Sequence, residues 1–170
     1  MKKTRIIVLM GLFIALNVIL TRIVRPVELP HLRVSFGFVA TSLSSIVLGP
    51  LLSGVAAAFA DVIGYFLFPS GSGFFPGFTF SALLTGIIYG LFLYKKPVSF
   101  LRVILSVLVV SLVIDIGLNT LWLSILLKTP WMVLFGSRIV KTAIMYPIQV
   151  VLIYTTWRYI GAQIRKIVKV

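Results

Sequence analysis

The sequence contains no cysteine, one histidine and only three acidic residues among its 170 positions. Without cysteine there are no disulfides, thiolate metal sites or cysteine nucleophiles, and one histidine cannot build a multi-histidine metal centre. There is no Gly-Lys dipeptide, so a G-x-x-x-x-G-K-[ST] phosphate-binding loop is excluded, and neither an HExxH motif nor a nucleophile elbow occurs. We therefore expect a protein without enzymatic activity, cofactor or metal ion.

Apolar residues dominate the composition, as in chains that reside in a lipid bilayer. Hydrophobic residues make up 60% and charged residues 11% of the sequence, and the mean hydropathy of +1.16 is far above that of a soluble domain. The net charge of +13 raises the possibility of nucleic acid, but apolar residues occupy the positions between the basic ones. No solvated basic face can form, so we exclude nucleic acid as a partner.

Long apolar runs predict an all-α membrane protein of six transmembrane helices in a single integral membrane domain, 1–170. Each run ends at a short segment with Pro or Gly, which terminates a helix. The first run is not followed by a small-x-small cleavage site, so it is expected to be a retained helix and not a signal peptide. The predicted spans are 6–24, 34–48, 51–67, 78–94, 100–127 and 133–158.

Lys and Arg are distributed unequally between the two sides of the predicted bundle. With six spans both termini share a side, which carries Lys2, Lys3, Arg5, Lys95, Lys96, Arg102, Arg158, Arg165, Lys166 and Lys169. The opposite side carries Arg22, Arg25, Arg33 and Lys128. Ten basic residues against four place both termini in the cytoplasm by the positive-inside rule.

Four ionisable residues lie deep inside the predicted spans, with one neutral amide as their companion, and ionisable groups in a membrane are costly and mark candidate sites. They are Asp61, Asp115, Asn119, Arg138 and Lys141. Counted from the outer helix ends at 1.5 Å per residue, most of them lie about 12 to 16 Å deep, so they can line one outward-facing chamber. The alternative is that the two carboxylates pair with the two cations and form a purely structural cluster.

Several residues near the outer ends are further candidates for ligand binding. Arg33 lies at the outer mouth, where it is placed either to hold a ligand carboxylate or to snorkel to the interface. Phe36, Tyr65 and Trp122 are candidates for stacking on a planar ring, although aromatic residues in such chains commonly pack together or face lipid.

The stretch "FPSGSGFFPGF" at 68–78 separates two predicted spans without a single charge. Its glycines permit a tight path, and aromatic residues such as Phe75 can fold back over an apolar pocket. We interpret it as a glycine-hinged aromatic gate, and an interfacial aromatic belt is the alternative.

Gly11 and Ala15 form a small-xxx-small pair in the first predicted span. Such a pair lets another helix approach closely in lipid. It lies in the inner half of the membrane, within reach of a partner on the cytoplasmic side, although small pairs are also common by chance in apolar sequence.

Several segments together resemble the folate-specific substrate-binding subunits, or S components, of energy-coupling-factor (ECF) vitamin transporters. These segments are "RVSFGF" at 33–38, "GP" at 49–50, "ADVIG" at 60–64, "FFPGFTFSALLTGIIYGLFL" at 74–93, "NTLWL" at 119–123 and "RIVK" at 138–141. The resemblance implies a six-helix subunit in a prokaryotic cell membrane that captures folate from outside with high affinity. It also implies a transmembrane coupling protein and two cytoplasmic ATPases as partners, which agrees with the absence of a phosphate-binding loop from this sequence. The family's Ala-xxx-Ala signature in the first helix stands here as Gly11 and Ala15.

Folate agrees with the residues above, since its pterin offers two adjacent N–H donors to one carboxylate and its glutamate tail carries two negative charges. Asp61 or Asn119 is the candidate for the pterin edge, and Arg33, Arg138 or Lys141 for the tail carboxylates or the ring carbonyl. An S component for riboflavin, thiamine or a queuosine precursor is the nearest alternative, and the cationic thiamine fits poorly with two basic residues. A stand-alone secondary carrier is disfavoured because no inverted repeat with paired broken helices is visible.

Overall fold

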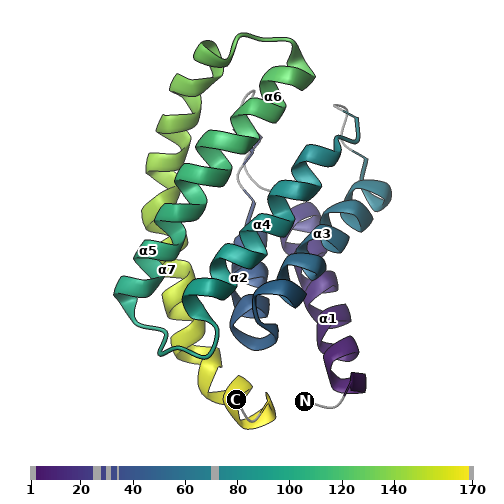
Figure 1. Ribbon diagram of the computed structural model, residues 1–170, viewed down its shortest axis with the longest axis vertical. Coiled ribbons are helices and arrows are strands. Elements are labelled where there is room, and N and C mark those ends of the chain that lie inside the picture. Colours follow the sequence, from purple (N-terminus) through teal and green to yellow (C-terminus); the bar gives the residue numbers. More distant parts are fainter. Residues whose placement is uncertain (1–2, 25–27, 30–31, 34, 70–72, 169–170) are drawn as a thin grey trace.

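The computed structural model describes residues 3–24, 28–29, 32–33, 35–69 and 73–168, and within them the chain forms six helical segments (Figure 1). Two of these segments combine α-helix with a wider π-helical stretch, labelled η. The elements are α1 (Lys3–Val18), η1 (Ile19–Ile23), α2 (Gly37–Leu48), α3 (Pro50–Leu67), α4 (Pro76–Leu93), α5 (Phe100–Val109), η2 (Val110–Leu118), α6 (Asn119–Leu127) and α7 (Trp131–Val168).

The all-helical, six-helix fold predicted from the apolar runs is confirmed. Five helices are long and apolar enough to cross a membrane, and the continuous segment Phe100–Leu127 has the bounds of the predicted run. The exception is α2, whose 12 residues rise only about 18 Å. The run at 34–48 is longer than this helix because Ser35 and Phe36 precede it in non-helical conformation.

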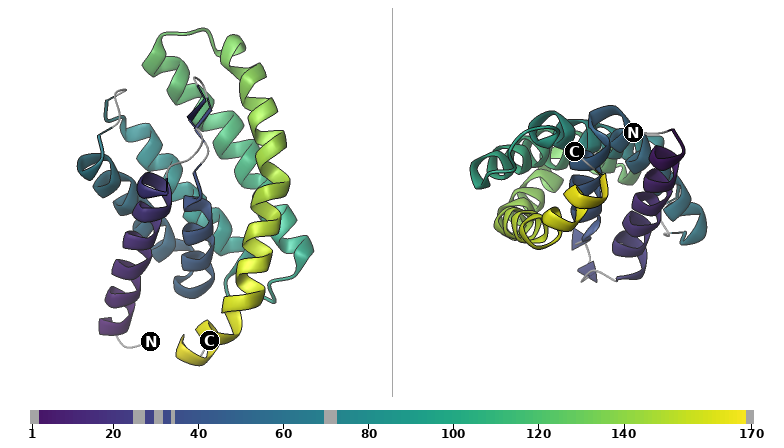
Figure 2. Two further views of the ribbon diagram at one scale, coloured as in Figure 1. Left: turned by 180° about the vertical axis from the view of Figure 1, so that it is seen from behind. Right: turned by 90° about the horizontal axis from the view of Figure 1, so that it is seen from below.

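The structure contains a short hairpin in the connection between η1 and α2 that was not predicted from the sequence. Strands β1 (Glu28–Leu29) and β2 (Leu32–Arg33) pair antiparallel, with Glu28 opposite Arg33. The hairpin lies in the half of the molecule away from the two chain ends (Figure 2).

Helices α2 and α3 are joined without a loop at Gly49 and Pro50. Gly49 has φ of +86°, a value that side-chain-bearing residues rarely adopt, and its N–H donates to Ser45 O at 3.1 Å. Pro50 begins α3, where its missing N–H costs no hydrogen bond. The "GP" dipeptide therefore reverses the chain within two residues and packs α2 beside α3.

Helices α3 and α4 approach each other closely at a pair of glycines. A Cβ added to Gly86 would lie 2.7 Å from the Gly54 backbone, and one added to Gly54 would lie 2.8 Å from Leu83 O. Ser45 and Ser53 both donate hydrogen bonds to Gly86 O, at 3.0 and 2.9 Å. Small residues and interhelical hydrogen bonds are the means by which helices associate in lipid.

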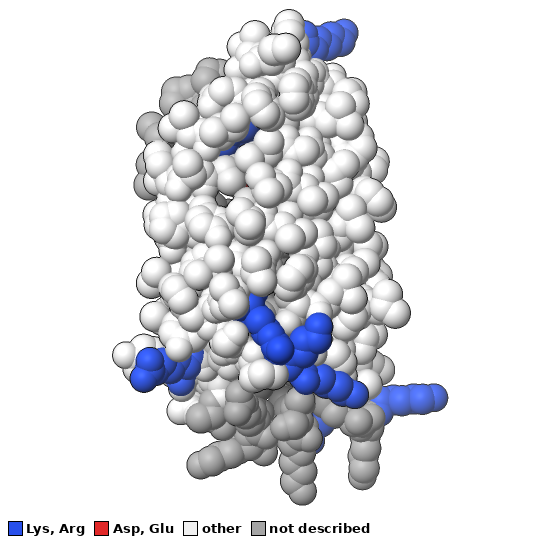
Figure 3. All heavy atoms as spheres, turned by 60° about the vertical axis from the view of Figure 1, so that its left-hand side comes forward, with Lys and Arg blue, Asp and Glu red and all other residues white. Residues whose placement is uncertain are grey.

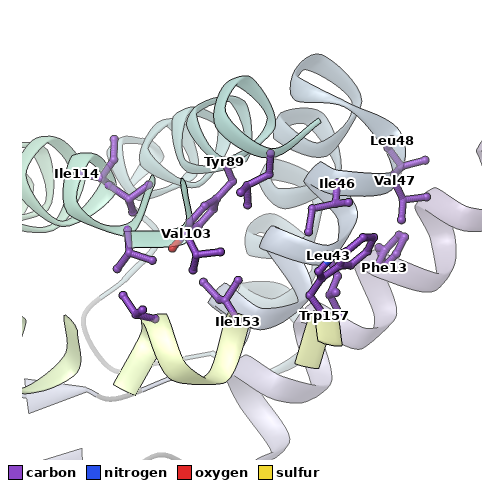
Figure 4. Close-up of a cluster of buried hydrophobic side chains, with 14 residues drawn as sticks. Phe13, Leu43, Ile46, Val47, Leu48, Tyr89, Val103, Ile114, Ile153 and Trp157 are labelled. Carbon is purple, nitrogen blue, oxygen red and sulfur yellow. The ribbon is translucent and has the colours of Figure 1, made fainter. Parts of the chain in front are cut away.

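The buried hydrophobic core occupies the half of the bundle that contains the chain ends. Its members come from five of the six helical segments, and α3 contributes the partly buried Leu52, which packs against them. Figure 4 shows Tyr89, Val103 and Ile153 together on one side of the cluster and Phe13 and Trp157 on the other. Both described chain ends and the α4–α5 connection lie at this end, and the α6–α7 connection lies at the opposite end (Figure 1). The core therefore closes one half of the bundle and leaves the other half for a cavity.

The outer surface is that of a protein surrounded by lipid. Figure 3 shows a broad uncharged band across one face, with most of the visible Lys and Arg residues gathered below it. Large apolar side chains such as Leu51, Phe66 and Met132 are at least 70% exposed. An apolar surface of this extent is stable in the hydrocarbon of a membrane and not in water.

We expect Gly86→Leu to lower the melting temperature of the detergent-purified protein, because overpacking a close contact costs about 1–3 kcal/mol. Gly136→Leu is the matched control, since a Cβ at Gly136 meets nothing within 4 Å. Circular dichroism melts of both variants measure the difference. Equal shifts for the two variants would contradict a structural role for the glycine contact.

Candidate functional site

A cavity of about 280 Å³ lies between the helices, and its wall combines polar and apolar side chains. All six helical segments contribute to it. Its charged lining residues are Arg22, Asp61, Asp115, Arg138 and Lys141. Its neutral polar lining includes Asn17, Thr21, Thr85, Tyr89, Asn119, Thr142 and Gln149. The structure therefore brings four of the predicted site residues, Asp61, Asn119, Arg138 and Lys141, to one cavity.

The carboxylate of Asp61 in α3 has two identified partners. Thr79 of α4 donates its hydroxyl to Asp61 Oδ2 at 2.8 Å. Arg22 Nη2 lies 3.9 Å from Asp61 Oδ1 and forms an ion pair with it. A Cβ on Gly64 would lie 3.3 Å from Arg22 Nε, so this glycine, one turn after Asp61, leaves room for the guanidinium.

Arg22 is a site residue that the sequence analysis missed. Its charge was counted at the outer flank of the first span, but its side chain is only 8% exposed and lines the cavity. It lies in η1, where the backbone follows a π-helical path. Hydropathy carries no information about this path, so the inward direction of Arg22 could not be predicted from it.

Polar contacts between α1, η1 and α2 hold this π-helical stretch in place. Asn17 Nδ2 donates to Thr41 Oγ1 at 2.8 Å, and Thr21 Oγ1 donates to Asn17 Oδ1 at 3.0 Å. Thr21 also packs directly against Gly37, where a Cβ would overlap its hydroxyl. These contacts fix the helix turn that carries Arg22.

A second charged group lies on the other side of the cavity. Asp115 of η2 accepts a hydrogen bond of 3.4 Å from Asn119 Nδ2 and interacts electrostatically with Lys141 and Arg138 of α7. Of the structural alternative considered above, in which both carboxylates pair with Arg138 and Lys141, the described residues show only this electrostatic interaction of Asp115, whereas the Asp61 carboxylate pairs with Arg22. With Arg22 and Asp61 included, the described wall carries three basic and two acidic side chains, a net charge of +1. The cavity favours an anion.

Three buried polar atoms of cavity-lining residues have no hydrogen-bond partner among the described residues. They are Asn119 Oδ1, Tyr89 Oη and Gln149 Oε1. Leaving such a group unsatisfied costs about 1–3 kcal/mol. A bound molecule that forms hydrogen bonds with these atoms would remove this cost and bind more tightly. Tyr89 and Gln149 carry no charge at neutral pH, so the cost of placing a charge inside a span does not single them out in the sequence.

Two of the predicted aromatic residues lie beside the cavity wall. The Phe75 ring packs against Trp122 and Phe78, with centroid distances of 5.8 and 5.9 Å. Trp122 Nε1 donates to Ser81 Oγ at 3.1 Å, and both Phe78 and Ser81 line the cavity. Phe75 and Trp122 are thus one contact away from its wall.

The other predicted residues lie farther out or are only partly described. Phe36 contacts the cavity-lining Phe38 at 6.3 Å between ring centroids. The ring of Tyr65 packs on Phe66 and Phe74, and Tyr65 is absent from the cavity's described lining. For Arg33 only the backbone in β2 is described.

The proposed gate at 68–78 and the proposed docking pair are described in part. Residues 70–72 lie outside the described residues, and the flanking Phe74 and Phe75 pack on two different aromatic clusters. Gly11 and Ala15 are exposed on α1, and a Cβ on Gly11 meets nothing within 4 Å. The gate motion stays a prediction.

Residues 5–156 match the family model of the ECF transporter substrate-specific component. The folate transporter FolT of Clostridium novyi (strain NT) is 41% identical over 160 residues, which cover 94% of this chain and 92% of that protein. The folate transporter FolT of Leuconostoc mesenteroides subsp. mesenteroides is 39% identical over 157 residues, with coverage of 89% and 83%.

A crystal structure of FolT bound with folic acid superposes on this fold with a TM-score of 0.82 at 42% sequence identity. The alignment covers 91% of this chain and 92% of the FolT chain. The sequence, the fold and the intramembrane cavity agree with one another, and the chain belongs to the substrate-specific components of ECF transporters.

Proposed function

We propose that this chain captures folate with high affinity from outside the cell and releases it to the cytoplasm when docked to an energising module. That module would consist of the family's transmembrane coupling protein and two cytoplasmic ATPase subunits. The observation that carries the proposal is a cavity of net positive charge with orphaned hydrogen-bonding groups, in a fold shared with folate-bound FolT.

The cavity chemistry suits folate in two respects. Its net charge of +1 favours the two carboxylates of the glutamate tail, for which Arg138 and Lys141 are the described candidates and Arg33 the candidate at the mouth. Asp61 is suited to accept the adjacent N–H groups of the pterin, since a carboxylate has two oxygens in one plane. The orphaned oxygen of Asn119 offers a further acceptor.

Other vitamins of the same transporter class remain the nearest alternative. A cavity with three basic and two acidic groups does not favour the cationic thiamine, whereas riboflavin and a queuosine precursor are neutral enough to require a direct test. Uptake that is coupled to an ion gradient and needs no ATPase partner would instead favour a secondary carrier.

Ligand titrations of the purified chain, followed by tryptophan fluorescence, test the proposal first. We expect saturable binding of folate and none of thiamine or riboflavin. Because Trp122 donates a hydrogen bond to Ser81 of the cavity wall, Trp122→Phe should remove most of the fluorescence response, and Trp131→Phe should retain it. Trp131 packs on Phe135 near the start of α7, so it serves as the control. The absence of folate binding would refute the proposal.

Asp61→Asn should weaken folate binding by about 2–3 kcal/mol, because a charge-assisted hydrogen bond becomes a neutral one. Isothermal titration calorimetry measures the affinity directly. An unchanged affinity would remove Asp61 from the binding site while leaving the folate assignment intact.

The exposed pair Gly11 and Ala15 on α1 is the proposed docking surface for the coupling protein, and both termini are proposed to face the cytoplasm. Gly11→Leu should preserve folate binding by the isolated chain, since Gly11 is exposed and a Cβ there meets nothing within 4 Å, yet abolish uptake in cells that contain the energising module. Gly136→Leu, at another open glycine in α7, should preserve both. Uptake that survives replacement of both Gly11 and Ala15 by Leu would place the docking surface elsewhere.

A further inference from the structure

We propose that Thr79 is a positioning residue that holds the Asp61 carboxylate toward the cavity and prevents it from closing onto Arg22. The inference rests on the proposed function, because it concerns the residue proposed to read the pterin. It assigns to Thr79 a role in ligand affinity that its position outside the cavity lining does not suggest.

The geometry of α3 and α4 places Thr79 opposite Asp61. Asp61 follows Gly54 by seven residues, and Thr79 precedes Gly86 by the same number. Seven residues are about two helical turns, so each residue lies on nearly the same helix face as its glycine. Helices α3 and α4 form a helical hairpin whose two helices touch at Gly54 and Gly86. About two turns from this contact the side chains of Asp61 and Thr79 face each other, and the 2.8 Å hydrogen bond joins them there.

The Thr79 hydroxyl is used differently from other threonine hydroxyls in the helices. Thr85 donates to Ser81 O at 2.8 Å and Thr155 to Val151 O at 2.6 Å, each within its own helix. This back-bonding is the usual outcome for a helical threonine. Thr79 instead donates to a carboxylate of another helix, 18 positions away.

The spacing of Arg22 and Asp61 explains why such a restraint is needed. Charge-assisted N–H···O bonds are about 2.7–2.9 Å long, whereas Arg22 Nη2 stands 3.9 Å from Asp61 Oδ1. In an interior of low dielectric, opposite charges at this distance attract strongly. The hydrogen bond from Thr79 to Oδ2 opposes the rotation that would bring Oδ1 closer to Arg22.

The Asp61 side chain is 26% exposed, so this arrangement leaves the carboxylate accessible within the cavity. A carboxylate that closed onto Arg22 would have to be pulled away before it could accept two ligand N–H groups. Part of the binding free energy would be spent on that rearrangement. Thr79 therefore raises affinity by keeping Asp61 preorganised, without touching the ligand.

The test measures folate affinity by calorimetry for Thr79→Val and Thr79→Ser, each in the wild-type and the Asp61→Asn backgrounds. Thr79→Val keeps the shape and removes the donor, and we expect it to raise the Kd by about tenfold, the scale of one hydrogen bond to a charged group. Thr79→Ser keeps the donor and should remain within about twofold of wild type. Thr155→Val is the control for loss of a helical threonine hydroxyl, and it should leave the Kd unchanged.

The Asp61→Asn background separates positioning from a merely structural role. A neutral amide is not drawn to Arg22 by its charge, so Thr79→Val should change the Kd there by no more than about twofold. An equal loss in both backgrounds, or no loss in the wild-type background, would overturn the inference. Thr79→Ala, with melting temperatures for every variant, replaces Thr79→Val if the latter does not fold. A wild-type chain that binds no folate would refute the proposed function itself.

Discussion

The close approach of α3 and α4 at Gly54 and Gly86 is the contact on which the rest of the structure depends. At this contact the Gly86 carbonyl of α4 accepts hydrogen bonds from Ser53 of α3 and from Ser45 of α2, which fixes the axial register of the helices as well as their distance. This axial register decides which side chains of α3 and α4 face each other farther along the two helices. The register that packs the two glycines is therefore the same register that brings Thr79 to Asp61.

The fold could be predicted from the sequence much more fully than the site. Apolar runs bounded by Pro and Gly identify the helices because length and hydropathy are sufficient to define a membrane span. The same runs contain no information about hydrogen-bond register, so η1 and η2 could not be foreseen. Arg22 shows the consequence, since a residue at the end of a span was assigned to the outer surface although its backbone turns it into the cavity.

The free-energy cost of burying a polar group in the membrane explains why some candidate residues could be predicted to lie together. A charged or amide group deep in a membrane span needs polar partners. Four such candidates line the same cavity, namely Asp61, Asn119, Arg138 and Lys141. Aromatic residues carry no such requirement, because lipid, protein and ligand all suit them. Tyr65 accordingly packs among other rings, and its type alone could not distinguish that environment from a binding site.

The π-helical stretch η2 has a consequence for how this chain tolerates changes in length. Nine residues, Val110–Leu118, wind more widely than an α-helix, and the α-helical turns resume at Asn119. A π-helical stretch accommodates an extra residue inside an otherwise α-helical span. Deleting one residue within it would leave the span just as apolar, and a return to α-helical turns would absorb the deletion and keep the directions of Asn119 and Trp122. Alignments of this segment therefore need to allow a one-residue gap inside an uninterrupted apolar run, where hydropathy alone would never place one.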